Sequence, residues 1–264
     1  MKIYMGTDLE GVAGVVSFSE QSFSDGRYYD AARKLLTAEV NAAVEGLLAA
    51  GVKEVLVDDG HGPGAVWFED LHPAARLLHG RPLAPRPVRE AIVAGYDACA
   101  MIGQHAMAGT AAGNLAHTQS SRTVDRYTLN GRPIGEIAQF ALYCGALGLP
   151  LIFLSGDEAA CQEVGELIPG ITTVAVKVGL SRGSAISLSA AGARWRIREG
   201  VQRAVERQRQ DPLPPLRWEG PFVLEKRFFF TDVADAAAAQ LGAERVDGQT
   251  VRFFGDDILE LIYR

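Results

Sequence analysis

The chain has 264 residues, of which 48% are hydrophobic and 22% charged, as in an ordinary soluble globular protein of one or two domains. Its formal net charge is −6 and its lysines and arginines form no cluster, so we expect no nucleic-acid partner. No apolar run reaches the roughly 18 residues that a membrane span needs, so we expect no membrane segment.

The chain begins with a strand-like run instead of the basic and apolar regions of a secretory leader, so we expect a cytoplasmic protein. Its three cysteines, Cys99, Cys144 and Cys161, are widely spaced in apolar surroundings and form no CxxC pair. We therefore expect free thiols in a reducing compartment, and no metal site built on cysteine.

Strand-like and helix-like segments alternate through the first two thirds of the chain. In chain order, we expect a strand at Lys2–Thr7, a helix at Tyr28–Ala50, a strand at Glu54–Val57, a short helix from Val88 and a strand at Ala98–Gly103. A hairpin from Arg122 with a turn at Asn130-Gly131, a helix at Gly135–Gly148, a strand at Leu151–Leu154 and a helix at Glu158–Leu167 follow.

This alternation predicts an α/β fold, with a mostly parallel sheet between two helical layers, over residues 1–170. From about Ile171 the pattern loosens into a strand at Thr173–Val178, an Arg-rich helix at Ala190–Gln208, a proline-rich linker, and then strand, helix, strand and helix. We expect residues 171–264 to form a smaller α+β part that packs on the first or serves in subunit assembly.

Polar side chains follow the predicted strands at their carboxyl ends, where open parallel sheets place their ligand sites. Asp8 and Glu10 follow the first strand, His61 the second and His105 the third, and Glu136 follows the hairpin. Other polar residues at these ends are Asp58, Asp59, Gln104, Asp157 and Glu158. If the strands are parallel neighbours, all these groups meet at one rim.

Two imidazoles and three carboxylates at one spot have the composition of a metal site, which suits zinc with manganese or cobalt as substitutes. Five protein ligands exceed the need of one open catalytic site and suit two ions about 3.5–4 Å apart that share a carboxylate. Asp8 is the candidate bridge because it is short and ends a central strand, while Gly11 and Gly14 let the backbone turn away.

Each of these residues also has a structural interpretation. Carboxylates after strands often cap the next helix, and Glu136 can merely complement a helix N-terminus. Isolated histidines usually lie on the surface or in the core, which we expect for His72 and His79. The glycines match neither the dinucleotide-binding nor the Walker A motif, so a phosphate loop is not indicated.

Seven segments taken together resemble the zinc-dependent D-aminopeptidases, densely to about residue 185 and thinly afterwards. They are, in order, MKIYMGTDLEGVAG, VLVDDGHG, MIGQHA, LAHT, NGRPIGEI, LSGD and TTVAVKVGLSRGSA. The resemblance implies a binuclear zinc exopeptidase that removes N-terminal D-residues from short peptides such as D-Ala-D-Ala. It implies that Asp8 bridges two Zn²⁺ ions, that Glu10 and His61 complete one site, and that His105 and Glu136 complete the other.

The resemblance also gives a role to His117, in the irregular stretch NLAHTQS, as the catalytic histidine. It implies a homo-oligomer, possibly a decamer of two pentameric rings. Gly60, Gln104, Ala116 and Phe140 depart from residues that are common at these places in the family. They remove no expected ligand, so they bear on the surroundings of the metals and on the substrate pocket.

Two other functions remain open from the sequence. The same ligand set serves a metallohydrolase of another small amide or of a phosphoester. A non-catalytic module that binds dipeptides is the other, although a full set of metal ligands with a third histidine suits it poorly.

Overall fold

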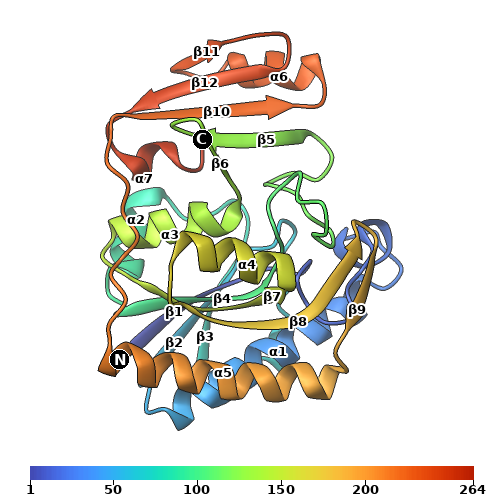
Figure 1. The fold of residues 1–264 in the computed structure, drawn as a ribbon, viewed down its shortest axis with the longest axis vertical. Coiled ribbons are helices and arrows are strands. Elements are labelled where there is room, and N and C mark those ends of the chain that lie inside the picture. The colour runs from blue at the N-terminus through green and yellow to red at the C-terminus, as the bar shows by residue number, and fades with distance from the viewer.

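A seven-stranded sheet forms the centre of the computed structural model, which describes residues 1–264 (Figure 1). Its strand order is β3-β2-β1-β4-β7-β8-β9, and every neighbouring pair is parallel except β8 with β9. The strands are β1 (Lys2–Thr7), β2 (Glu54–Asp59), β3 (Ala75–Leu78), β4 (Ala98–Gln104), β7 (Leu151–Asp157), β8 (Thr172–Ser181) and β9 (Ser184–Ser187). The first strand of the chain thus lies in the middle of the sheet.

Helices cover both faces of this sheet. On one face α1 (Tyr29–Ala49) packs against α5 (Ala190–Gln210), and their apolar sides share a buried cluster with strand residues such as Ile3 and Val55. On the other face lie α2 (Arg86–Val93), α3 (Glu136–Ala146) and α4 (Glu158–Leu167), which share a second cluster with Tyr4 and Met101. Alternating strand side chains feed the two clusters, as the two-residue period of a strand requires.

A second, antiparallel sheet lies beyond α3, at the top of Figure 1. Its order is β11 (Ala243–Arg245), β12 (Thr250–Gly255), β10 (Phe222–Phe228), β5 (Val124–Leu129) and β6 (Arg132–Ile134). The helices α6 (Thr231–Ala238) and α7 (Ile258–Leu261) accompany it, and two single turns, η1 (Phe18–Ser22) and η2 (Phe68–Asp70), stand in loops. No helix combines the length and apolarity that crossing a bilayer requires.

The expected fold class is confirmed, since a mostly parallel sheet lies between helical layers and a smaller α+β part contains the end of the chain. The two sheets do not separate at residue 170, however. Strand β8 hydrogen-bonds to β7 and α5 packs on α1, so residues 172–210 belong with the large sheet. Conversely, the hairpin β5–β6 pairs with β10 in the small sheet.

Helices α1 and α5 approach so closely that a glycine is needed between them. A Cβ on Gly46 would lie 2.4 Å from the carbonyl oxygen of Arg198 and 2.5 Å from a methyl of Val201. We expect Gly46→Ala to lower the free energy of unfolding by about 1–3 kcal/mol through overpacking. A Cβ on Gly165, in α4, would meet no atom within 4 Å, so Gly165→Ala should instead add roughly 0.5–1 kcal/mol. Denaturant unfolding of both variants measures the contrast, and equal effects would contradict it.

Candidate metal centre

The carboxyl ends of β1, β2 and β4 bring the expected residues to one rim. In register, Thr7 of β1 faces Asp59 of β2 and Ile102 of β4, so the three strands end side by side. The loops that follow carry Asp8, His61 and His105. Gly11 permits this convergence, because a Cβ there would lie 1.9 Å from the carbonyl oxygen of Gln104.

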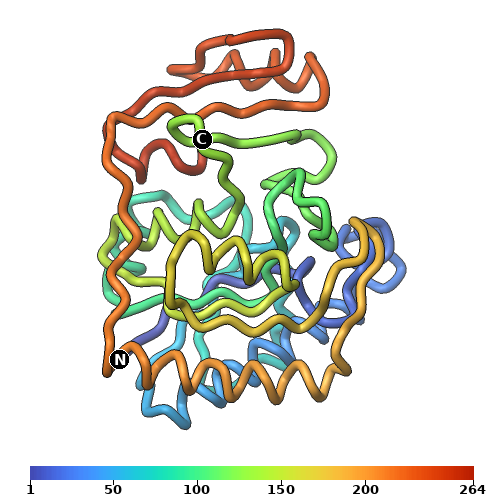
Figure 2. Tube along the Cα trace, in the orientation of Figure 1, coloured from blue at the N-terminus to red at the C-terminus, as the bar shows by residue number.

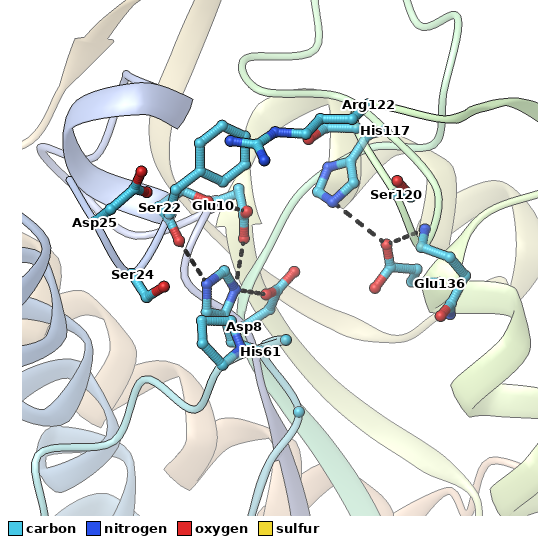
Figure 3. Close-up of a pocket in the computed structure, with 16 residues that line it drawn as sticks. Asp8, Glu10, Ser22, Ser24, Asp25, His61, His117, Ser120, Arg122 and Glu136 are labelled. Carbon is cyan, nitrogen blue, oxygen red and sulfur yellow. Dashed lines mark hydrogen bonds and ion pairs between the residues drawn. The ribbon is translucent and has the colours of Figure 1, made fainter. Parts of the chain in front are cut away.

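Asp8 stands between two imidazoles, one on each of its carboxylate oxygens. Figure 3 shows the contact with His61. Its Oδ1 lies 3.1 Å from Nδ1 of His61, and its Oδ2 lies 3.0 Å from Nε2 of His105. Glu10 approaches the same His61 nitrogen at 3.2 Å with Oε2. One carboxylate thus faces two imidazoles, and the metal bridge that the sequence suggests for Asp8 stays a prediction.

Glu136 and His117 complete the cluster from the other side. Glu136 is the first residue of α3, and its Oε1 lies 3.5 Å from Nε2 of His105 and 3.7 Å from Nε2 of His117. The same oxygen accepts a 2.7 Å hydrogen bond from the backbone N–H of Gln119. The rings of His105 and His117 stack with centroids 4.0 Å apart. All six candidate residues therefore lie in one cluster.

Backbone carbonyls orient the three imidazoles. His61 contacts the carbonyl oxygen of Ser22 through Nε2, at 2.9 Å, which turns its Nδ1 toward the carboxylates. His105 and His117 are held the opposite way, each by a contact from Nδ1 to the carbonyl oxygen of Ala106 or Leu115. The nitrogen that faces the cluster is thus free to accept a proton or a metal ion.

The cluster is buried and attracts positive charge. Burial alone lowers the pKa of His61, but attraction to Glu10 and the hydrogen bond with Asp8 outweigh it and raise this pKa well above its usual value. Burial alone raises the pKa of Glu136, but its close contact with His105 and the attraction between them outweigh burial and lower this pKa to about 2. Protonated imidazoles thus supply the positive charge that a bound cation would otherwise supply to the carboxylates.

The donor atoms suit a metal ion. Buried atoms of three residues, Oδ2 of Asp8, Oε2 of Glu10 and Nε2 of His105, have no hydrogen-bond partner. Two donors on one tetrahedral zinc ion stand about 3.3 Å apart, and the contacts within the cluster span 3.0–3.7 Å. Two overlapping groups have the geometry to hold an ion: Asp8, Glu10 and His105, and His105, His117 and Glu136.

Lys177 is a supporting residue that the sequence reasoning missed. Its ammonium, buried at 2% exposure in β8, donates to the carbonyl oxygens of Glu10 and Val15, each at 2.5 Å, and to Oδ1 of Asn114 at 2.7 Å. Figure 2 shows the segment after β1 lying beside the β8–β9 hairpin, where these bonds form. Lys177 thereby fastens the loop of Glu10 to the loop that leads to His117. The signal was a lysine inside the otherwise apolar strand TTVAVKVG.

Other polar residues of the rim have local roles. Asp59 accepts hydrogen bonds from the backbone of Ala65 and Val66. Asp157 caps α4 through the N–H of Ala160 and also accepts from the N–H of Asn114. These hydrogen bonds explain the presence of both carboxylates at the rim, and both lie outside the histidine cluster.

A buried cluster of carboxylates and imidazoles at the rim of a parallel α/β sheet defines a metal-dependent hydrolase. The chain belongs to the D-aminopeptidase family, whose model matches residues 1–263. It is 33% identical over 264 residues to the D-aminopeptidase of Bacillus subtilis (strain 168), covering 98% of this chain and 93% of that protein. Its fold matches that of the Zn-dependent D-aminopeptidase DppA from Bacillus subtilis, which is described as a self-compartmentalizing protease. The TM-score is 0.91 and the sequence identity is 32%, and the match covers 100% of this chain and 94% of that one.

Removing the Lys177 ammonium should loosen the metal centre. We expect Lys177→Met to weaken Zn²⁺ binding roughly 10–100-fold, as is typical when a group that orients a ligand is lost. Competition with a chromogenic chelator measures the affinity.

Lys226→Met is the matched control, because Lys226 is also buried, lies in the small sheet and packs on the rings of Tyr127 and Phe253 without a hydrogen bond to the protein. Its Zn²⁺ affinity should stay at the wild-type value. An unchanged affinity in Lys177→Met would show that the tether to Glu10 does not matter for the metal.

Proposed function

We propose that this chain is a zinc metallopeptidase that removes the N-terminal D-residue from short peptides such as D-Ala-D-Ala. The observation that carries the proposal is the Asp8 carboxylate, which has one imidazole on each oxygen. Membership of the D-aminopeptidase family supports the reaction, and the Zn-dependence of the solved relative supports the metal.

Each subunit holds two Zn²⁺ ions in this proposal, with Mn²⁺ or Co²⁺ as possible substitutes. Asp8 would bridge them, Glu10 and His61 would complete one site, and His105 and Glu136 would complete the other. The contacts of Asp8 divide in the same way, since His61 faces Oδ1 and His105 faces Oδ2. Bound zinc would lower the pKa of a water molecule toward about 7 and would polarise a carbonyl group.

His117 serves as the group that moves a proton. Its Nδ1 is engaged with the carbonyl oxygen of Leu115, so its Nε2 faces the cavity beside Glu136. The ring is held in place by the stacked ring of His105 and by the edge contact with Phe18. A fixed imidazole that exposes one nitrogen can take a proton from the nucleophile and return it to the leaving amine.

Assembly and compartment follow the same relationship. We infer a homo-oligomer, of which a decamer of two pentameric rings is the form expected, and the description of the solved relative as self-compartmentalizing supports it. The three cysteines form no disulfide, which suits a reducing cytoplasm.

The reaction is tested by the release of free alanine from D-Ala-D-Ala and L-Ala-L-Ala by the purified protein. We expect cleavage of the D-peptide alone, loss of cleavage with a chelator, and recovery when zinc is restored. A protein that binds two Zn²⁺ ions per subunit and cleaves neither peptide would retain the metal centre and contradict the substrate.

The role of His117 is tested by His117→Ala. We expect kcat for D-Ala-D-Ala to fall by roughly 10²–10⁴, the range typical of a lost acid–base group, while two Zn²⁺ ions remain bound. His79→Ala is the control, because His79 lies on an exposed loop and stacks on Phe68. Loss of one zinc ion from His117→Ala would identify His117 as a ligand instead, and full turnover would exclude a catalytic role.

A further inference from the structure

Two cavities flank the cluster and share Asp8 and Glu136 in their walls. One, of about 360 Å³, contains His117 together with several serines and Asp25. The other, of about 320 Å³, lies on the side of α2 and α3. A molecule placed across Asp8 and Glu136 can therefore reach into both.

The second cavity contains a guanidinium that no hydrogen bond satisfies. The side chain of Arg89, in α2, is only 21% exposed, and its Nε is buried without a partner. Its nearest anion, Oδ2 of Asp58, lies 3.6 Å away, beyond hydrogen-bond distance. A largely buried cation with unused donors favours an acidic partner strongly.

No carboxylate of the second cavity hydrogen-bonds to Arg89, although Asp58 forms an ion pair with it at 3.6 Å. Asp58 accepts a short hydrogen bond from the hydroxyl of Tyr4, and Asp59 accepts from two backbone N–H groups. Asp8 and Glu136 face the histidines. Arg81 adds a second guanidinium to the wall. Arg81 already donates to the carbonyl oxygens of Asp59 and His61, so Arg89 is the guanidinium of this wall that is left for an anionic group of a ligand.

The remaining wall suits a peptide. Phe140 and Met101 provide apolar surface, and the buried Oε1 of Gln104 has no hydrogen-bond partner. That oxygen can accept a peptide N–H. An amide donor, a small apolar side chain and a carboxylate together describe the C-terminal part of a short peptide.

We propose that Arg89 binds the free terminal carboxylate of the substrate peptide, so that the second cavity receives its C-terminal residue. This inference rests on the proposed function, since it takes the scissile bond to lie over Asp8 and Glu136. It assigns Arg89 to substrate selection and not to the chemical step.

The test compares kcat/KM for D-Ala-D-Ala and for its C-terminal amide, which has the same scissile bond and no carboxylate. We expect the zinc-loaded wild-type protein to prefer the acid by roughly 10–100-fold, mostly through KM, as for a lost charge-assisted hydrogen bond. In Arg89→Met this preference should fall toward one, and Arg89→Lys should retain part of it.

Two matched variants locate the effect. Arg86 stands one turn earlier on α2 and pairs with Glu90 and Glu260 outside the cavity, so Arg86→Met should keep the wild-type preference. Arg122 lines the first cavity, with its guanidinium 3.8 Å from the ring centroid of Phe23, and Arg122→Met should also keep it.

Several outcomes would overturn the proposal: a wild-type preference near one, a preference that survives Arg89→Met, or a preference lost in Arg122→Met in place of Arg89→Met. If Arg89→Met does not fold, the wild-type ratio and Arg89→Lys decide. If the wild-type protein cleaves neither compound, the proposed function fails, and calorimetric titration with the intact acid and amide then decides the carboxylate proposal separately.

Discussion

The shared carboxylate of Asp8 is the interaction on which the rest of the site depends. One oxygen faces His61 and the other faces His105, so a single short side chain at the end of the central strand fixes two imidazoles. This is possible because β1 lies between β2 and β4, and loops from both neighbours converge on it. Glu10 and Glu136 then add negative charge that the histidines alone balance only when they carry protons. A cation in the same place satisfies all the donors without protonation, which is why the arrangement favours a metal ion.

A buried charge, the ammonium of Lys177, supports the site from beneath. Lys177 has a pKa lowered to about 8, mainly by burial and against the pull of Asp157 and Glu39. Its three protons nevertheless all have acceptors, two of them backbone carbonyls of the loop that carries Glu10. A loop without regular structure needs such fixed partners for its backbone groups. The ammonium of Lys177 thus satisfies backbone carbonyls of the loop, as neighbouring strands do for one another in a sheet. It also joins the Glu10 loop to Asn114, three residues before His117.

Local sequence patterns predicted most of the fold, because strong periodicity and turn residues act over short distances. Helices α1 and α4 and strand β1 have nearly the expected bounds, and Asn130 and Gly131 do adopt the positive φ values of the expected turn. Strands β3 and β9 were missed because each has only four residues, none of them fully buried, which is too short for a periodic pattern to stand out. The assignment of β8 to the large sheet and of β5 to the small one depends on partners far along the chain, which no local pattern reveals.

The six clustered residues were found because parallel strand ends gather polar groups, whereas Lys177 acts through a distant loop.

The two cavities beside the cluster differ in the charged and polar groups that line them. The first cavity carries Asp25, Arg122 and several hydroxyl groups, and the second carries Asp58, Asp59, Arg81 and Arg89 with the ring of Phe140. A short peptide also has two different ends, since it carries an ammonium at one end and a carboxylate at the other. If Arg89 binds the terminal carboxylate, the reversed orientation would bring the peptide ammonium to this guanidinium, and like charges repel most strongly in surroundings of low dielectric constant. In that case the unused donors of Arg89 would select which end of a short peptide faces His117.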